Sequence, residues 1–332
     1  MSKNLAIAGV TGAVGQEFLT ILAERQFPFA SIKMLASSRS AGKKITFMDK
    51  EYTVEELTAD SFDGVDIALF SAGGARSREF APAAVKAGAI VVDNSSAFRM
   101  DPDVPLVVPE VNAEAIKQHK GIIANPNCST IIANVPLWPL HKANPVKRLV
   151  VSTYQAASGA GQSAMLEMIQ QAREVLDGKP VTCKTLKYQL AFNVYCHDSK
   201  IGPNGYNEEE MKMVHETHKI FSCPEMAITC TCVRVPVMRT HCESLNIEFA
   251  NPITPDEVRN LLADAAGVSI IDDRENNYFP MPVDATGKDD VFVGRIRQDE
   301  SIADNRGINL WIAGDQIRKG AALNAIQIAE LL

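Results

Sequence analysis

The sequence predicts an α/β protein in which an N-terminal Rossmann-like domain with a doubly wound parallel sheet precedes an α+β domain with a mixed sheet. Two observations lead to this prediction. Up to residue 124, short apolar runs alternate with amphipathic stretches, as in strand–helix–strand units. Beyond residue 145 the apolar runs lengthen and the alternation becomes irregular. The last stretch, 315–332, has one apolar face and predicts a C-terminal helix that returns to the first domain.

In the first part of the chain, the predicted strands are short apolar runs and the predicted helices carry apolar residues on one face. The strands are expected at 5–8, 32–36, 66–70, 90–93 and 121–124. The helices are expected at 13–25 and 78–87. The first helix should end near Phe27-Pro28, because proline cannot continue a helix.

In the second part, the strands are expected at 148–155, 226–235, 244–249, 291–297 and 308–313. Helices are expected at 161–176 and 208–221, where the apolar spacing is helical. We therefore expect one domain at 1–127 with 314–332, and a second domain at 128–313.

Composition narrows the class of protein. The chain has 332 residues, 46% of them hydrophobic and 22% charged, which is typical of a soluble globular protein with two cores. A net charge of −7 without a basic block disfavours nucleic acid as a partner. The sequence has neither a secretory signal pattern nor an apolar run that could span a membrane, so we expect a cytoplasmic protein with no membrane partner.

Seven scattered cysteines, an odd number, favour a reducing compartment over a disulfide framework. Cys223, Cys230, Cys232, His241 and Cys242 form a loose cluster, but the paired spacing of structural zinc ligands is absent. We therefore expect no metal. Cys230 and Cys232 should point to the same face of a strand, into a core.

A glycine-rich turn, Gly9-Val-Thr-Gly12-Ala-Val-Gly15, separates the first predicted strand from the first predicted helix. Glycines at such a turn let a pyrophosphate approach the helix N-terminus closely. The spacing differs from the commonest dinucleotide fingerprint, and a purely structural turn is the alternative. The position between strand and helix favours nucleotide binding.

The loop after the second predicted strand indicates which nucleotide is bound. An NAD site usually has Asp or Glu at this place, which binds the ribose 2′-hydroxyl. Here the chain runs Ala36-Ser-Ser-Arg39-Ser-Ala-Gly-Lys-Lys44, with hydroxyls and cations but no carboxylate. These groups suit a 2′-phosphate, so NADP is predicted over NAD; a solvated basic loop is the alternative.

The segment Asn125-Pro-Asn-Cys128-Ser-Thr130 indicates a nucleophile. It lies between an apolar run and a helical stretch, which places the thiol of Cys128 at a helix N-terminus. The helix dipole and unpaired N–H groups there favour a thiolate and can bind an oxyanion or phosphate. The alternative is an ordinary buried cysteine.

Several separated segments together resemble the aspartate-β-semialdehyde dehydrogenase family, over essentially the whole chain. They are Gly9-Val-Thr-Gly-Ala-Val-Gly15, Asp93-Asn-Ser-Ser-Ala-Phe-Arg99, Val108-Pro-Glu-Val-Asn112, Asn125-Pro-Asn-Cys-Ser-Thr130, Thr153-Tyr-Gln-Ala-Ala-Ser-Gly-Ala-Gly161, Glu216-Thr-His-Lys219, Arg234-Val-Pro-Val-Met-Arg-Thr-His241 and Lys319-Gly-Ala-Ala-Leu-Asn-Ala325.

The resemblance implies an oxidoreductase that reduces L-4-aspartyl phosphate with NADPH to L-aspartate 4-semialdehyde and phosphate, reversibly, through a cysteine thioacyl intermediate. It also implies a place in lysine (through diaminopimelate), threonine and methionine biosynthesis. The expected assembly is a homodimer formed through the second domain, with a tetramer as the open alternative.

The resemblance also implies a role for each matching residue. Cys128 would be the nucleophile, His241 the general acid/base, and Gln155 the residue that orients the substrate. Arg234 would bind the substrate α-carboxylate and Glu216 its ammonium group. The implied phosphate site is Arg99, Asn127 and Lys219. The implied cofactor site is Gly9, Thr11, Gly12, Ala13, Val14, Ser37, Ser38, Arg39, Ser71, Ala72, Ser158, Gly159, Gly161 and Asn324.

Simpler interpretations exist for several of these residues. Arg234 could be a surface or ion-pair arginine, His241 could be structural, and Glu216 with Lys219 could be a surface pair on a helix. Arg234 and His241 are also an odd number of residues apart. On one regular strand they would face opposite ways, so a bulge or bend near Pro236 is expected.

Three other functions compete with this one. N-acetyl-γ-glutamyl-phosphate reductases typically have Gly-Cys-Tyr-Pro at the nucleophile and a substrate without an ammonium group. Glyceraldehyde-3-phosphate dehydrogenases typically have Ser-Cys-Thr-Thr-Asn and an acidic residue after the second strand. This chain has Asn127-Cys-Ser-Thr130 and no such acid. A non-catalytic NADP-binding protein would not need the full set of nucleophile, acid/base and anion sites.

Overall fold

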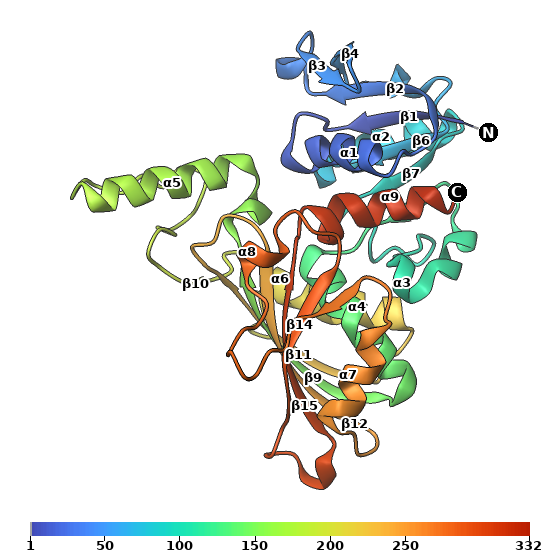
Figure 1. Ribbon diagram of the computed structural model, residues 1–332. Coiled ribbons are helices and arrows are strands. Elements are labelled where there is room, and N and C mark those ends of the chain that lie inside the picture. Colours follow the sequence, from blue (N-terminus) through green and yellow to red (C-terminus); the bar gives the residue numbers. More distant parts are fainter. Residues whose placement is uncertain (1) are drawn as a thin grey trace. The chain divides into compact units, whose positions relative to one another are not determined.

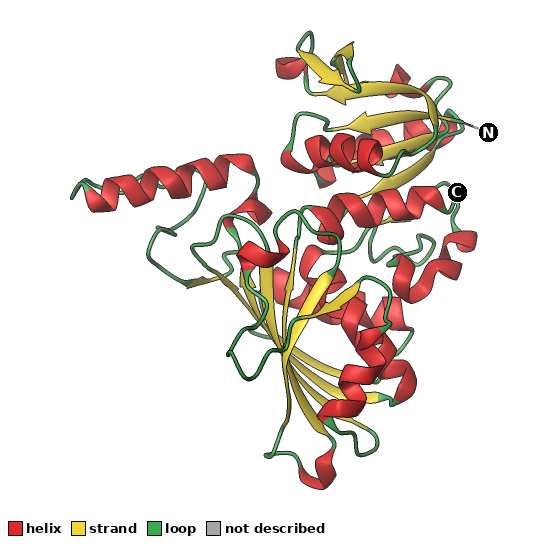
Figure 2. Cartoon of the chain, viewed as in Figure 1, coloured by secondary structure: helices red, strands yellow, loops and turns green. Residues whose placement is uncertain are grey.

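The computed structural model describes residues 2–332, and Met1 lies outside this range. Two compact units make up the chain (Figures 1 and 2). Unit 1 consists of the residues up to Asn127 and a second segment that begins at Ala321. The sequence analysis placed the start of this second segment at 314. Unit 2 is Cys128–Gly320. The predicted fold class is confirmed for both units.

Unit 1 contains a six-stranded sheet of order β5-β2-β1-β6-β7-β8 in which every pairing is parallel. Its strands are β1 (Lys3–Ala8), β2 (Phe29–Ala36), β5 (Glu55–Glu56), β6 (Ile67–Phe70), β7 (Ile90–Asp93) and β8 (Ile122–Ala124). Its α-helices are α1 (Ala13–Glu24), α2 (Gly74–Lys86), α3 (Pro109–Asn112) and α9 (Leu323–Glu330).

Alternate residues of β1 enter two different cores, which is why the sheet is covered on both faces. Ile7 packs with Phe18 of α1 and Ile326 of α9 in one buried cluster. Its neighbour Ala8 packs with Ala84 of α2 in the other. A parallel sheet buried on both faces is the doubly wound arrangement.

A small hairpin, β3 (Lys44–Phe47) with β4 (Lys50–Thr53), was not predicted. Its two turn residues, Met48 and Asp49, both have positive φ, at 49° and 59°. Asn-Gly or Asp-Gly usually fills such a turn. The sequence lacks that signal here, and the two strands are short and mostly polar.

Unit 2 contains a seven-stranded mixed sheet of order β10-β11-β9-β12-β15-β14-β13. Its strands are β9 (Val146–Gln155), β10 (Tyr195–Cys196), β11 (Ala227–Arg234), β12 (His241–Phe249), β13 (Val268–Ile270), β14 (Val291–Gln298) and β15 (Gly307–Gly314). Its α-helices are α4 (Cys128–Ala143), α5 (Gln162–Leu176), α6 (Glu208–Phe221), α7 (Pro255–Ala263) and α8 (Pro282–Ala285).

One face of this sheet packs against α4, α6 and α7. Leu245, Ile247 and Phe249 of β12 are fully buried, whereas the residues between them are only half-buried. Tyr154 of β9 is exposed and Trp311 of β15 is half-buried; these two strands flank β12, and the two ring centroids are 5.2 Å apart. Figure 1 shows α5 extending away from the sheet of unit 2.

The predicted C-terminal helix 315–332 is wrong in its first part. A π-helical turn, Arg318–Ala322, precedes α9. The carboxylate of Asp315 accepts hydrogen bonds from the backbone N–H groups of Ile317 at 2.9 Å and Arg318 at 3.2 Å, as an N-cap residue does. The N–H of Gly320 donates to the carbonyl of Asp315 at 3.1 Å, the i+5 spacing of a π-helix, so the segment after Asp315 does not start as an α-helix.

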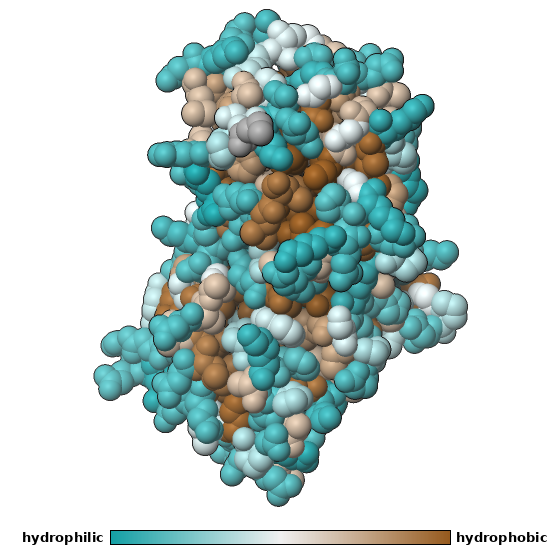
Figure 3. Space-filling model, turned by 90° about the vertical axis from the view of Figure 1, so that its right-hand side faces the viewer, coloured by the Kyte–Doolittle hydropathy of each residue, from teal (hydrophilic) through white to brown (hydrophobic). Residues whose placement is uncertain are grey.

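Hydrophilic residues cover most of the face of the chain that Figure 3 shows. Among the described residues, no helix is long and apolar enough to cross a membrane.

The turn between β1 and α1 fits only with glycine at position 9. Gly9 has φ +93°, and a Cβ there would lie 2.3 Å from the carbonyl oxygen of Ser71. We expect Gly9→Ala to destabilise the protein by clearly more than the roughly 1–2 kcal/mol of a left-handed backbone alone. Gly42→Ala is the matched control, because Gly42 also has positive φ but has open space around it. Urea unfolding measures both; equal losses for the two variants would contradict the prediction.

Candidate active site

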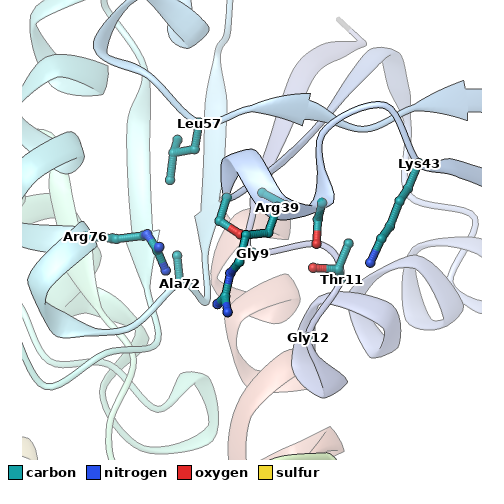
Figure 4. Close-up of a pocket in the computed structure, with 11 residues that line it drawn as sticks. Gly9, Thr11, Gly12, Arg39, Lys43, Leu57, Ala72 and Arg76 are labelled. Carbon is teal, nitrogen blue, oxygen red and sulfur yellow. The ribbon is translucent and has the colours of Figure 1, made fainter.

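A cavity of about 410 Å³ opens beside the glycine turn of unit 1 (Figure 4). Its lining residues are Gly9, Thr11, Gly12, Ala36, Ser37, Arg39, Ser40, Lys43, Leu57, Ala72 and Arg76. Six of the predicted cofactor residues are among them. Ala13 and Val14 begin α1 next to the cavity, Ser38 begins the short turn after β2, and Ser71 follows β6 against Gly9.

Three cations line this cavity and no carboxylate does, among the residues that the structure describes. Arg39 and Lys43 come from the segment after β2, and Arg76 comes from α2. Figure 4 shows Arg39 between Arg76 on one side and Lys43 on the other. Arg76 was missed by the sequence analysis because it is distant in the chain from both the glycine turn and the basic loop.

In unit 2, Gln155, Arg234 and His241 lie at the ends of three neighbouring strands. Arg234 ends β11 and pairs in register with Gln155, which ends β9. His241 begins β12 on the other side of β9, where its neighbour Cys242 pairs with Tyr154. All three side chains are buried, with exposed fractions of 6%, 2% and 1% for Arg234, Gln155 and His241.

The expected bend near Pro236 is present and separates two strands. Because β9 lies between β11 and β12, the segment 235–240 must cross the end of β9. The N–H of Val235 donates to the carbonyl of Gln155 at 3.0 Å, and the N–H of Ala157 donates to the carbonyl of Val237 at 2.8 Å. The crossing brings Arg234 and His241 to one place.

Gly159 lies where Arg234 and His241 converge. A Cβ at Gly159 would be 3.3 Å from Nε2 of His241 and 3.6 Å from Nη1 of Arg234. Ser158 and Gly159 belong to a short 3-10 turn after β9, and Gly161, with φ +93°, leads into α5. The Oγ of Ser158 accepts a hydrogen bond from Gln316.

His241 is held as a neutral imidazole. Its Nδ1 accepts a hydrogen bond from the backbone N–H of Ala156 at 3.0 Å, so the single ring proton is on Nε2. Burial, together with the positive charge of Arg234, lowers the pKa of His241 to about 3. The ring faces Gly159 with its N–H.

Gln155 is held from two sides. Its Nε2 donates to Oγ of Ser129 and to Oε1 of Glu209, both at 3.0 Å. Its Oε1 is buried without a partner among the described residues. Glu209, at the start of α6, also forms an ion pair with Lys212 at 2.9 Å. Glu209 belongs to a run of three glutamates, which the sequence analysis took only as a helix start.

Arg234 is anchored at both ends of its guanidinium. Nη1 donates to the carbonyl oxygen of Ala156 at 3.1 Å, and Nη2 lies 2.9 Å from Nε2 of His197. The buried Nε has no partner in residues 2–332. At 6% exposure, Arg234 is not a surface arginine.

Cys128 begins α4, as predicted, and is half-buried. Ser129, which binds Gln155, is the next residue, so the thiol lies one residue from this network. A Cβ at Gly320 would come 2.9 Å from Cβ of Cys128, which shows how closely the π-helical turn packs there.

The other cysteines have different surroundings. Burial raises the pKa of the Cys242 thiol to about 12. Cys230 and Cys232 point into the core as predicted, with sulfur atoms 3.5 Å apart. Cys183 and Cys196 are exposed. Cys128 is the thiol at an α-helix start.

Glu216 and Lys219 lie on α6, which Asn207 caps by accepting the N–H of Glu210 at 2.9 Å. Glu216 is only 1% exposed, which excludes an ordinary surface pair.

The remaining predicted residues belong to unit 1. Arg99 is buried and donates from Nε to the carbonyl of Asn125 at 2.9 Å. Asn127 is buried at the end of the unit. Asn324, on α9, donates to Oδ1 of Asn125 at 2.7 Å.

Comparison with known proteins identifies the family. Residues 4–119 match the family described as semialdehyde dehydrogenase, NAD binding domain, and residues 137–319 match semialdehyde dehydrogenase, dimerisation domain. The chain is 56% identical over 329 residues to the aspartate-semialdehyde dehydrogenase of Synechocystis sp., which covers 99% of this chain and 97% of that one.

Solved structures agree with this. The crystal structure of aspartate semialdehyde dehydrogenase II from Vibrio cholerae complexed with ASA has a TM-score of 0.97 and 46% identity, covering 100% of this chain and 98% of that chain. Aspartate semialdehyde dehydrogenase with NADP from Candida albicans has a TM-score of 0.78 and 26% identity, covering 100% and 98%. The resemblance seen in the sequence is thereby confirmed, and the chain belongs to the aspartate-semialdehyde dehydrogenase family of oxidoreductases.

Proposed function

We propose that this enzyme reduces L-4-aspartyl phosphate with NADPH to L-aspartate 4-semialdehyde and phosphate, reversibly, in the biosynthesis of lysine, threonine and methionine. The observation that carries the proposal is the convergence of Arg234, Gln155 and His241 at three strand ends next to the helix that begins at Cys128. The Vibrio cholerae relative crystallised with ASA supports this choice of substrate.

Cys128 is the proposed nucleophile. The N-terminus of α4 favours its thiolate, which attacks the acyl carbon and displaces phosphate to leave a thioacyl enzyme. NADPH, when bound, supplies the hydride that reduces the thioester. The carbon–sulfur bond then breaks, the aldehyde leaves, and Cys128 returns to the thiolate.

His241 acts as the acid/base group through Nε2 in this proposal. Since Nδ1 is occupied by the N–H of Ala156, the proton available to the reaction is the one on Nε2. From Nε2, this proton can form a hydrogen bond with the anionic sulfur of Cys128 or with the oxyanion that forms on the substrate. Gln155 orients the substrate in this proposal. Ser129 and Glu209 hold its Nε2, and its Oε1, which has no partner among the described residues, can accept a hydrogen bond from the substrate.

The substrate is an amino acid, and the residues proposed to bind it have opposite charges. Arg234 binds the α-carboxylate, as a guanidinium can do with two hydrogen bonds. Glu216 binds the ammonium group. Arg99, Asn127 and Lys219 bind the phosphate that leaves.

The cavity of unit 1 suits NADP better than NAD. Arg39, Lys43 and Arg76 supply positive charge for a 2′-phosphate, and no carboxylate lines the cavity in the described part of the chain to bind a 2′-hydroxyl. Gly9 and Gly12 allow the pyrophosphate to approach α1. Ser158, Gly159, Gly161 and Asn324 are proposed for the nicotinamide side. The relative from Candida albicans carries NADP.

We further propose a homodimer formed through unit 2. The matched family is described as a dimerisation domain. Leu176, Phe192 and Ile201, on α5 and the segment after it, are 78%, 65% and 67% exposed. Large apolar side chains that are this exposed suit burial against a partner.

Replacing the nucleophile tests the reaction. Cys128→Ala should lower turnover by about a thousandfold or more, because no thioacyl enzyme can form. NADP binding, measured by fluorescence titration, should be nearly unchanged. Cys196→Ala is the matched control, since Cys196 is exposed on β10, and it should keep full turnover. Near-normal turnover in Cys128→Ala would rule out the thioacyl mechanism.

Cofactor preference is tested in the cavity of unit 1. Arg39→Ala should weaken NADP binding by about ten- to a hundredfold, the effect of losing roughly 1.5–3 kcal/mol from a charged hydrogen bond. NAD binding should change little, because NAD has no 2′-phosphate. Arg78→Ala is the control, because Arg78 is on α2 but does not line the cavity. Equal weakening of both cofactors by Arg39→Ala would show that Arg39 does not bind the 2′-phosphate.

A further inference from the structure

His197 lies in the segment between β10 and α6 and touches the proposed substrate site. Its Nε2 is 2.9 Å from Nη2 of Arg234. The ring is half-buried, and neither the sequence analysis nor the proposed function uses it.

The protonation state of His197 follows from its partners. A guanidinium has only donors, so Nε2 of His197 must accept the hydrogen bond from Arg234. The ring is therefore neutral, with its proton on Nδ1. Nδ1 lies 3.1 Å from Oγ of Ser199, which accepts this proton, and 3.3 Å from the backbone nitrogen of the same residue. The contact with the backbone nitrogen of Ser199 would make Nδ1 an acceptor. A neutral ring has only one acceptor nitrogen, and here that nitrogen is Nε2, so the hydrogen bond of Nδ1 is the one to Oγ of Ser199.

The same segment is tied to the residues around the nucleophile. The Oγ of Ser199 also accepts the N–H of Glu209 at 3.2 Å. Glu209 accepts from Gln155, and Gln155 donates to Ser129, next to Cys128. One hydrogen-bond network therefore positions both Arg234 and Gln155.

Charged groups face His197 from each neighbouring element. Arg234 of β11 and Lys212 of α6 oppose its protonation, whereas Glu209 of α6 and Asp198 of its own segment favour it. His241 of β12 is also close enough to interact electrostatically. Burial is the largest effect and lowers the pKa of His197 below 6.5. An imidazolium here would lose the acceptor for Arg234 and place a second cation at hydrogen-bond distance from it.

We propose that His197 is a positioning residue that holds the guanidinium of Arg234 in place for the substrate α-carboxylate, and that protonation of His197 releases it. The proposal rests on the proposed function in one respect, the binding of the α-carboxylate by Arg234. The hydrogen bond from Arg234 to the carbonyl oxygen of Ala156 fixes only Nη1. Loss of His197 therefore leaves Nη2 of Arg234 without its anchor.

Steady-state kinetics in the oxidative direction test the proposal. His197→Leu removes the acceptor and should raise the KM for aspartate semialdehyde by about tenfold, while the KM for phosphate stays unchanged. His197→Gln, whose amide oxygen can accept from Arg234, should restore most of the affinity. Lys200→Gln, three residues further along the chain and exposed, is the control and should leave both KM values unchanged. An unchanged KM for the semialdehyde in His197→Leu would overturn the proposal.

The pH dependence gives a second test that a merely structural role would not pass. In the wild-type enzyme the KM for the semialdehyde should rise at acidic pH, below the pH range in which an ordinary histidine titrates, as His197 gains a proton, because burial lowers the pKa of His197. In His197→Gln this rise should disappear, because glutamine does not titrate. The same acidic rise in both proteins would overturn the proposal.

A measurement without turnover separates this proposal from the proposed function. In ¹⁵N-histidine NMR, the ring signals missing from His197→Gln identify His197. The ring signals of His197 should show a neutral imidazole protonated on Nδ1 at pH 7.5. The Arg234→Leu substitution should raise the pKa of His197. An imidazolium, or a proton on Nε2, would overturn the proposal. Wild-type protein inactive on the semialdehyde would instead overturn the proposed function, and the NMR titration would still decide whether His197 holds Arg234.

Discussion

The position of β9 between β11 and β12 is the constraint on which the active site depends. It places Gln155 between Arg234 and His241, three polar side chains that would be costly to bury alone. The peptide group of Ala156, directly after β9, serves two of them: its carbonyl accepts from Arg234, and its N–H donates to His241. The Nε2 of Gln155 donates to Ser129 and Glu209. The backbone at the end of one strand thus orients both Arg234 and His241.

The same arrangement determines which groups are charged. His241 is neutral because it is buried beside a guanidinium, and its proton is confined to Nε2 by Ala156. Thiols in the core of unit 2 are kept protonated by burial, as for Cys242. Cys128 differs because it begins a helix and is only half-buried. In the proposed mechanism, the attack on an acyl phosphate uses Cys128 as the thiol, His241 as a neutral proton donor and Arg234 as a fixed cation, all within one unit.

Much of this could be predicted from local sequence. Strand–helix alternation, the glycine turn and the helix start at Cys128 are all short-range patterns, and each is present in the structure. What could not be predicted depends on pairing between distant segments. Strand order β11-β9-β12 is not the order in the chain, so no local pattern shows that Gln155 adjoins Arg234. Arg76, Glu209 and His197 join their sites only through the fold, and the β3–β4 turn lacks the glycine that would have marked it.

The central claim is that the site reacts with an amino-acid semialdehyde, for which a buried carboxylate, Glu216, binds the ammonium group. Reduction of NADP in the presence of phosphate tests it most directly, with aspartate semialdehyde compared with N-acetylglutamate semialdehyde and glyceraldehyde 3-phosphate under the same conditions. The account predicts phosphate-dependent reduction with aspartate semialdehyde and little with the other two aldehydes. Equal or faster reduction with N-acetylglutamate semialdehyde, which has no ammonium group, would contradict it.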